Sequence, residues 1–198
     1  MVSLESTLFV IPARGGSKGI PKKNLRKIHG KSLTEWALIV ANRFPPATVA
    51  LSSDSQEILQ LAEGYPGTVP VLRPESISKD TSTDQEALNH ALQFCESMTS
   101  VRFETIVMLQ PTAPSRTVEL IQEALMLKES EHASSVWSVD LVDLKLHARK
   151  QLHANPSGKV RLVVDSTLPL RRQDLTPTFI RNGECYVLSR DVVMNDAI

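Results

Sequence analysis

The chain has 198 residues, 41% of them hydrophobic and 22% charged, values typical of one soluble globular domain with a sizeable core. Its 22 basic residues balance 22 acidic ones, so no overall basic field draws it to nucleic acid or a membrane surface. No apolar run approaches the roughly 18 residues of a membrane span, and Cys95 and Cys185 lack the spacing of a disulfide framework or a zinc site. We therefore expect a cytoplasmic protein with no nucleic-acid or membrane partner.

Apolar runs alternate with segments of helical periodicity along the chain, a pattern typical of βα units on a mostly parallel sheet. Strands are predicted at residues 7–12, 48–52, 69–73, 105–109, 134–139 and 184–188. Helices are predicted at residues 33–44, from about 56, after a capping box at 83–86, and at 119–129. A turn signal at residues 155–158 predicts a β-hairpin arm at about 140–170. Because we find no linker, residues 1–198 are predicted to form a single domain.

The segment after the first predicted strand, IPARGGSKGIPKKN, is strongly basic. Seven basic residues and no acidic ones lie between Arg14 and Lys31, which leaves 15 basic against 22 acidic residues elsewhere. Its glycines allow a sharp turn that aims backbone amides at an anion. The spacing matches neither a P-loop nor GxGxxG. The position between a strand and a helix favours a phosphate site over a solvated basic turn or a nucleic-acid patch.

Other motifs have simpler alternative interpretations. Arg171 and Arg172 are compatible with surface salt bridges, LQPTAPSR with an ordinary proline turn, and Asn182-Gly183 with a turn before the last strand. We interpret Asp54 as a helix cap. We find no Ser/His/Asp or Cys/His arrangement, and the histidines, at positions 29, 90, 132, 147 and 153, lack metal-ligand spacing.

Four motifs taken together resemble one known family. IPARGGSKGIPKKN resembles the nucleotide-binding signature of the CMP-sialic acid synthetases (acylneuraminate cytidylyltransferases), and RPESISKDTSTDQEAL, LQPTAPSR and RRQDLTPTFIRNGECYV continue the resemblance in order. The resemblance implies an α/β fold, a mostly parallel-sheet nucleotidyltransferase (Rossmann-like) domain with a β-hairpin dimerisation arm. It also implies a homodimeric cytidylyltransferase that joins CTP to a sialic-acid-like (nonulosonic) 2-keto sugar acid, releasing pyrophosphate with Mg²⁺ as cofactor.

The same resemblance implies roles for individual residues. Arg14 and Lys23 would be catalytic, with Lys23 closest to the reacting α-phosphate. Residues expected to bind the nucleotide are Ala13, Gly15, Gly16, Ser17, Lys18, Asn24, Arg73, Asp80, Thr81 and Ser82. Residues expected to bind the acceptor are Gln110, Thr112, Arg172, Gln173, Asn182 and Gly183.

The metal ligands are not identified from the sequence. Family members bind magnesium through a carboxylate pair after the last strand, which neither Asp191 nor Asp196 matches. The remaining candidates are Asp54, Asp80, Asp84 and Asp174. Three explanations stay open: a truncated chain, a shortened enzyme that uses other carboxylates, or a catalytically impaired relative that binds nucleotide.

The acceptor also stays open. Arg181 stands one position later than the corresponding arginine of some relatives, and a one-residue shift turns a side chain to the other face of an extended segment. Sialic, legionaminic, pseudaminic and shorter 2-keto-3-deoxy acids are all candidates. A transferase that activates a different sugar or a phosphonate with CTP or UTP is a further alternative.

Overall fold

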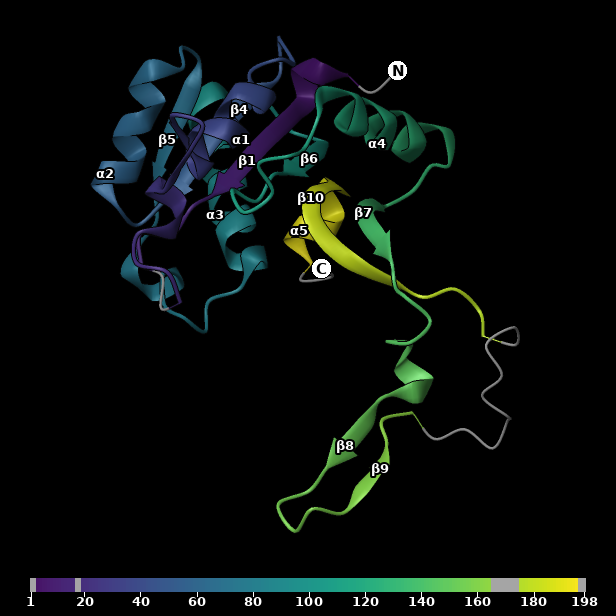
Figure 1. The fold of residues 1–198 in the computed structure, drawn as a ribbon. Helices are drawn as coiled ribbons and strands as arrows, with labels where there is room; N and C mark the ends of the chain where they lie inside the picture. The colour runs from purple at the N-terminus through teal and green to yellow at the C-terminus, as the bar shows by residue number, and fades with distance from the viewer. Residues whose placement is uncertain (1–2, 17–18, 165–174, 196–198) are drawn as a thin grey trace. The chain divides into compact units, whose positions relative to one another are not determined.

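The structure, a computed structural model, describes residues 3–16, 19–164 and 175–195. The chain divides into two compact units, which are considered separately: unit 1 comprises residues 1–138 and 183–198, and unit 2 comprises residues 139–182. Figure 1 shows the helices and strands of unit 1 and the hairpin of unit 2. Within these ranges no helix combines the length and the apolar character needed to cross a membrane.

A sheet with strand order β5-β4-β1-β6-β10-β7 forms the centre of unit 1. Strands β5, β4, β1 and β6 are mutually parallel, whereas β10 runs antiparallel to β6. The strands are β1 (Thr7–Pro12), β4 (Thr48–Ser53), β5 (Thr68–Leu72), β6 (Thr105–Met108), β7 (Ser135–Leu141) and β10 (Phe179–Ser189). The predicted α/β fold with a mostly parallel sheet is thus confirmed.

Helices cover both faces of this sheet because successive strand residues point to opposite sides. In β1, Phe9 and Ile11 pack with one apolar cluster, and Leu8 and Val10 pack with the other. The first cluster includes residues of α1 (Leu33–Ala41), α2 (Gln56–Leu59) and α4 (Val118–Ser130); the second includes residues of α3 (Asp84–Thr99) and α5 (Arg190–Met194). Each fully buried large aliphatic side chain stabilises this core by roughly 1.5–3 kcal/mol.

Two of the helices begin with capping boxes. The predicted box of α3 is confirmed: Thr83 accepts a hydrogen bond from the Glu86 amide, and the Glu86 carboxylate accepts one from the Thr83 amide. Ser32 and Glu35 make the same exchange at α1, where no box was predicted. Both arrangements satisfy amides that the first helical turn leaves without a partner.

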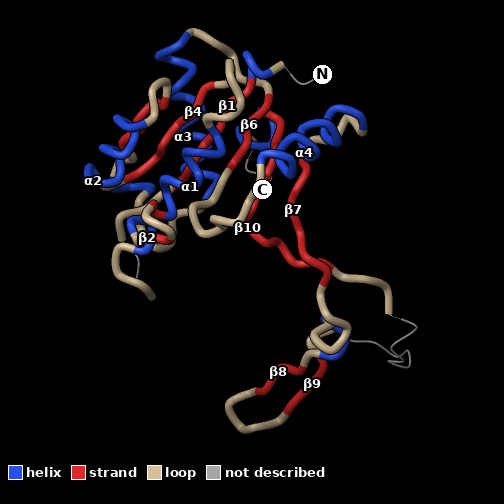
Figure 2. Tube along the Cα trace, turned by 45° about the horizontal axis from the view of Figure 1, so that its top comes forward, coloured by secondary structure: helices blue, strands red, loops and turns tan. Residues whose placement is uncertain are grey.

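Unit 2 contains the predicted β-hairpin. Strands β8 (Leu152–Ala154) and β9 (Val160–Leu162) pair antiparallel, as the red segments of Figure 2 show. At the turn, the Asn155 side chain accepts hydrogen bonds from the amides of Ser157 and Lys159, and Gly158 has a φ of +81°. A positive φ favours glycine, which explains the residue at this position.

Several short elements were not predicted. The strands β2 (Lys27–Ile28) and β3 (Lys31–Ser32) pair within the basic segment, and α5 follows β10 where only a tail was expected. Short 3-10 helices lie at Leu4–Ser6, Lys23–Leu25, Gln60–Gly64, Glu75–Ile77 and Ala148–Lys150. None of these segments is long enough to show a clear helical or strand period.

Candidate functional site

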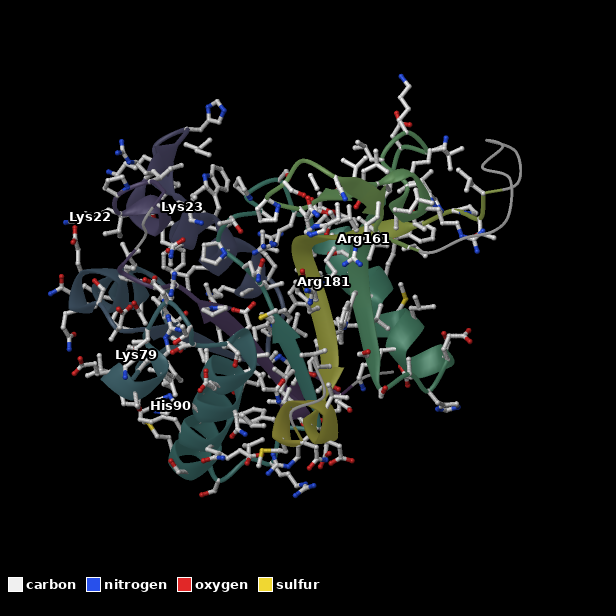
Figure 3. All side chains as sticks on the ribbon, turned by 90° about the horizontal axis from the view of Figure 1, so that it is seen from below. Lys22, Lys23, Lys79, His90, Arg161 and Arg181 are labelled. Atoms are coloured by element: carbon white, nitrogen blue, oxygen red, sulfur yellow. The ribbon has the colours of Figure 1, made fainter. Side chains whose placement is uncertain are left out.

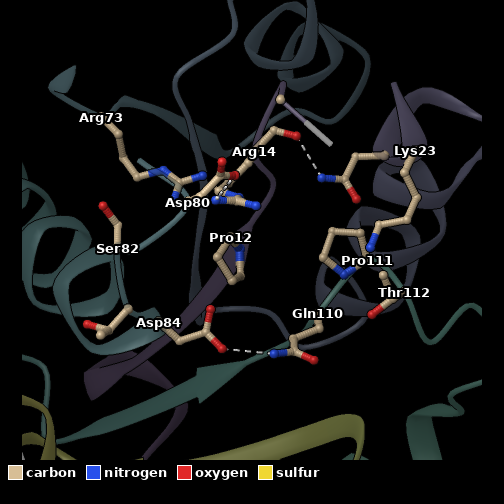
Figure 4. Close-up of a pocket in the computed structure, with 13 residues that line it drawn as sticks. Pro12, Arg14, Lys23, Arg73, Asp80, Ser82, Asp84, Gln110, Pro111 and Thr112 are labelled. Atoms are coloured by element: carbon tan, nitrogen blue, oxygen red, sulfur yellow. Dashed lines mark hydrogen bonds and ion pairs between the residues drawn. The ribbon is translucent and has the colours of Figure 1, made fainter. Parts of the chain in front are cut away.

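A cavity of about 340 Å³ lies at the carboxyl ends of the parallel strands of unit 1. Strand β1 pairs with β4 on one side and with β6 on the other. The chain passes from β1 to β4 and β5 on the first side and then crosses over to β6 on the second. α/β sheets place their ligands at the carboxyl ends of the strands where the strand order reverses in this way. The lining residues come from the end of β1, the segments after β1, β5 and β6, and the start of α3: Pro12, Arg14, Gly16, Lys23, Asn24, Arg73, Asp80, Ser82, Thr83, Asp84, Gln110, Pro111 and Thr112. Figure 4 shows them around the cavity.

The start of the basic loop is fixed against the turn after β4. The Gly15 amide donates to Asp54 Oδ1 (2.8 Å), and a Cβ at Gly15 would lie only 2.7 Å from the Ser55 Cβ. Asp54 makes no cap to α2, whose N-cap residue is Ser55 and has no side-chain capping bond. Our interpretation of Asp54 as a helix cap was therefore wrong, because its carboxylate accepts the Gly15 amide instead.

The second half of the basic loop places Lys23 and Asn24 at the cavity. Asn24 is buried, and its side-chain amide donates to the Arg14 carbonyl (2.8 Å), while its own carbonyl accepts from the Thr34 hydroxyl (2.9 Å). Lys22 has a left-handed backbone, and its Nζ pairs with Glu57 at 2.6 Å (Figure 3). This pair holds Lys22 on the outside of the loop, whereas Lys23 lines the cavity (Figure 4).

The opposite side of the cavity carries Arg73, Asp80 and Ser82 (Figure 4). Arg14 connects the two sides, since its Nη1 donates to the Lys79 carbonyl (3.0 Å) and lies 3.4 Å from Asp80 Oδ1. Arg73 is only 5% exposed, and its Nε and Nη2 have no hydrogen-bond partner in the part of the chain described. Burial lowers the pKa of Arg73, and the negative charge of Asp54 partly offsets this effect.

The floor of the cavity links α3 to the segment after β6. Gln110 Nε2 donates to Asp84 Oδ2 (2.9 Å), a contact drawn in Figure 4. Asp84 is the first residue of α3, so the positive end of that helix also faces the cavity. The cavity therefore combines three cations (Arg14, Lys23, Arg73) with two carboxylates and several neutral hydrogen-bonding groups. Such a set suits a polyphosphate joined to a hydroxyl-rich group.

A family model described as cytidylyltransferase matches residues 8–191, nearly all of the chain. The chain belongs to the cytidylyltransferase family. The predicted family resemblance is thereby confirmed, and the charged cavity is the region in which a nucleotide-binding function of this family is to be sought.

Curated relatives of this chain include proteins named for several sugar acids. It is 36% identical over 139 residues to the CMP-N,N'-diacetyllegionaminic acid synthase of Legionella pneumophila, covering 70% of the chain and 59% of the relative. It is 26% identical to the pseudaminic acid cytidylyltransferase of Campylobacter jejuni, covering 90% and 76%. The N-acylneuraminate cytidylyltransferase of Streptococcus agalactiae is 27% identical, with 96% of the chain but only 45% of the relative covered.

A solved structure supports the fold independently. The CMP:2-keto-3-deoxy-manno-octonic acid synthetase, solved in complex with CTP, superposes with a TM-score of 0.68 at 19% identity, covering 96% of the chain and 77% of that protein. A 4-diphosphocytidyl-2C-methyl-D-erythritol synthase from Anaerococcus prevotii gives a TM-score of 0.58 at 13% identity. At these identities the likeness concerns the arrangement of helices and strands alone.

The structure brings many of the predicted site residues to this cavity. Those that line it are Arg14, Gly16, Lys23, Asn24, Arg73, Asp80, Ser82, Gln110 and Thr112. Ala13 is fully buried behind it, with its amide donating to the Ser52 carbonyl (2.9 Å), and Thr81 is exposed and does not line it. Gly183 lies beside Gln110, and Asn182 belongs to unit 2, where it donates to Asp140 (3.1 Å). Ser17, Lys18, Arg172, Gln173 and the metal candidate Asp174 lie outside the described residues.

Other lining residues were not assigned a substrate role from the sequence. Thr83 and Asp84 line the cavity because α3 begins there with its capping box. The capping box in the sequence could therefore have indicated these two residues. The sequence suggests Asp84 only as a metal candidate. Pro12 and Pro111 end and follow the strands that frame the cavity. Their position at strand ends would have identified them as well.

Proposed function

We propose that this protein transfers the CMP group of CTP to a nonulosonic acid and releases pyrophosphate. The observation that carries the proposal is the cavity at the strand ends, where Arg14, Lys23 and Arg73 face one space in a cytidylyltransferase chain. The names of the relatives support the substrate class, since they concern legionaminic, pseudaminic and N-acylneuraminic acids.

In this reaction the anomeric hydroxyl of the acceptor attacks the α-phosphorus of CTP. A new oxygen–phosphorus bond forms, the bond to the β-phosphate oxygen breaks, and the hydroxyl proton passes to solvent. The protein has to align two anions and stabilise the charge that grows on the leaving oxygens. Arg14 and Lys23 suit that task, because both are cationic and both line the cavity. Gly16 of the glycine-rich loop also lines the cavity, where its amide would add a donor to the phosphates.

The remaining cavity residues divide between the two substrates in this proposal. Arg73 and the segment containing Asp80 and Ser82 border one side, where the cytosine and ribose would lie. Gln110 and Thr112 border the other side and would contact the sugar acid. Both offer neutral donors and acceptors, which match the hydroxyl groups of a nonulosonic acid.

Magnesium is part of the proposal. The described residues contain no group of three or more His, Cys, Asp or Glu side chains that could hold a metal ion. Mg²⁺ in such sites is held by one or two carboxylates plus substrate phosphates, and Asp80 and Asp84 are carboxylates that line the cavity. These residues fit the ion. When bound, it would neutralise charge on the triphosphate and on the departing pyrophosphate.

We also propose a homodimer formed through unit 2. The hairpin and its flanks expose several large apolar side chains, among them Leu146, Leu152, Val160, Val163 and Phe179, each more than half exposed. Large exposed apolar side chains gathered in one small unit are typical of an interface, and the family resemblance favours a second copy of the chain as the partner. A cytoplasmic location is consistent with Cys95 and Cys185, which are both free thiols.

The test is an assay of pyrophosphate release with CTP, magnesium and a panel of nonulosonic acids. CTP is compared with UTP, and binding of CTP is recorded on the same sample as a thermal shift. We expect release with at least one acceptor, loss of release on chelation of magnesium, and preference for CTP. A thermal shift with CTP but no release from any acceptor would contradict the proposal.

A pair of variants in the basic segment assigns the activity to the cavity. Lys23→Gln removes a cation that lines the cavity and should lower kcat by roughly 10²–10³-fold. Lys27→Gln removes an exposed cation of β2 and serves as the matched control, with activity unchanged. Equal effects of the two substitutions would show that the general charge of the segment matters instead of the cavity.

The dimer is tested by sedimentation. Leu152→Glu combined with Val160→Glu places charge on both strands of the hairpin and should produce monomers. Leu127→Glu, on the exposed side of α4 in unit 1, is the control and should leave the dimer intact. A monomeric wild-type protein at all concentrations would refute this part of the proposal.

A further inference from the structure

Arg116, in the segment between β6 and α4, is a buried cation that does not line the cavity. It is 5% exposed, and its Nη2 donates to the carbonyl of Gln110 and, at 3.3 Å, to the carbonyl of Gly183. Its Nε and Nη1 have no hydrogen-bond partner among the residues that the structure describes. Burial lowers the pKa of Arg116 to about 10, against the opposing influences of Cys185 and then Glu184. The side chain is therefore still charged at neutral pH.

A charge buried in this way is not explained by stability. Removing a guanidinium from water is costly, and a well-packed apolar side chain of similar size commonly serves a core at least as well. What an apolar residue cannot do is donate to two carbonyls at once. Arg116 joins the segment after β6 to the glycine at the start of the buried part of β10, residues separated by 67 positions.

The two carbonyls belong to residues that together fix one side chain at the cavity. Gln110 Nε2 is held by Asp84 Oδ2 at 2.9 Å. On its other side, a Cβ added at Gly183 would lie 2.8 Å from Gln110 Oε1, and Gly183 has a φ of +79°. The Gln110 side chain thus occupies space that only glycine leaves open. A shift of either backbone segment would displace the Gln110 amide group.

We propose that Arg116 is a positioning residue for the acceptor side of the cavity, acting through Gln110 and Gly183 without touching either substrate. The inference rests on the proposed function, in which Gln110 contacts the sugar acid. Among the described residues, no hydrogen bond or ion pair joins Arg116 to the basic loop or to Arg73, and Arg116 reaches the nucleotide side only through Gln110 and Asp84. Loss of Arg116 should therefore affect the acceptor more strongly than the nucleotide.

The kinetic test uses Arg116→Lys, which keeps the charge but replaces the planar guanidinium whose Nη2 donates to both carbonyls, and Arg116→Met, which removes the charge and the donors. We expect the acceptor kcat/KM to fall roughly 10- to 100-fold in Arg116→Met, the range that small misplacements of binding groups produce. Arg116→Lys should lie between it and the wild type, and in both variants the KM for CTP should change less than the KM for the acceptor. Arg102→Lys, at an exposed arginine paired with Glu104 (2.7 Å), is the matched control.

A double-mutant cycle shows whether Arg116 acts through Gln110. If it does, Arg116→Met should have little further effect on the acceptor kcat/KM once Gln110→Ala is present. Additive losses would overturn the inference, as would equal increases in the KM values for both substrates. Gly183→Ala perturbs the same contact from the other side and should reproduce the acceptor defect, even where an Arg116 variant folds poorly.

A measurement without turnover keeps this inference separate from the proposed function. The Gln110 carbonyl also accepts the Ala113 amide (3.3 Å), whereas the Leu109 amide donates to the Val10 carbonyl (3.0 Å) in the sheet. In Arg116→Lys, hydrogen exchange should accelerate at Ala113 and stay unchanged at Leu109. Unchanged exchange at Ala113 would refute the positioning role, whether or not the wild type releases pyrophosphate. Absence of release by the wild type would count against the proposed function alone.

Discussion

Replacing Gly15 by alanine tests how the basic loop is anchored. A Cβ at this position would lie 2.7 Å from the Ser55 Cβ, 3.4 Å from its Oγ and 3.7 Å from Asp54 Oδ1. Carbon atoms do not approach so closely, so the loop must move away from the turn after β4. That movement also strains the 2.8 Å hydrogen bond from the Gly15 amide to Asp54. Arg14 would move with it, because it is the preceding residue.

The size of the effect follows from these two contacts. Forcing an additional methyl group into a packed site costs about 1–3 kcal/mol, and a hydrogen bond to a charged acceptor contributes about 1.5–3 kcal/mol. Part of this cost is relieved when the loop shifts, so we take about 1–3 kcal/mol as the penalty on the binding-competent loop. A penalty of that size corresponds to a roughly 5- to 150-fold weaker affinity.

The assay is CTP binding by calorimetry, together with the KM for CTP from pyrophosphate release. Gly64→Ala is the matched control, because a Cβ at Gly64 meets nothing within 4 Å and the residue lies outside the cavity. We expect Gly15→Ala to weaken CTP binding and Gly64→Ala to leave it unchanged. Wild-type affinity in Gly15→Ala would refute the argument.

A second-site substitution makes the test sharper. Ser55→Gly removes the Cβ that the new methyl group would meet, and Ser55 makes no side-chain capping bond that would be lost. Glycine at an N-cap in place of serine costs only a few tenths of a kcal/mol. The double variant Gly15→Ala, Ser55→Gly should therefore regain CTP affinity. If it does not, the steric explanation is wrong, even if the single variant is defective.

Three further predictions concern the core of unit 1. Burial raises the pKa of the Cys95 and Cys185 thiols to about 12, so a thiol reagent at pH 8 should label neither in the native protein and both in denaturant. Leu88→Ala truncates a fully buried side chain and should lower the free energy of unfolding by about 2–5 kcal/mol, measured by urea denaturation. Burial and, secondarily, the charge of Arg73 lower the pKa of His90 below 6.5. As the pH falls, the unfolded chain therefore binds a proton at His90 before the folded chain does, which favours unfolding. The free energy of unfolding should decrease as the pH falls below about 6.5. Thermal unfolding of His90→Gln should lack this decrease.

The elements with strong local patterns were predictable from the sequence. β1 occupies the predicted range, Thr7–Pro12, because an apolar run bounded by a proline and a glycine-rich loop has few alternatives. The capping box at Thr83 was recognised because two residues at a fixed spacing, Thr83 and Glu86, suffice to form it. The hairpin turn at Asn155 was recognised for the same reason.

Elements that depend on distant partners were not predictable in the same way. β10 begins at Phe179, five residues before the predicted strand, and its first residues carry no buried pattern. The predicted helix at residues 33–44 ends at Ala41, because the chain leaves the helix before the prolines at 45 and 46. The period continues to Phe44, which is buried outside the helix and packs against Phe9, with ring centroids 5.0 Å apart and the ring planes tilted by 31°.

The two sides of the cavity differ in how far their residues lie apart in the sequence. The cations of the basic loop stand within ten positions of one another, so their concentration of charge is evident from the amino-acid sequence alone. The Gln110 side is assembled by contacts with Asp84 and Gly183, which lie 26 and 73 positions away, and by a buried arginine that sequence alone cannot tell from a surface one. In the proposed function, acceptor choice depends on these long-range contacts, so it has to be found by experiment.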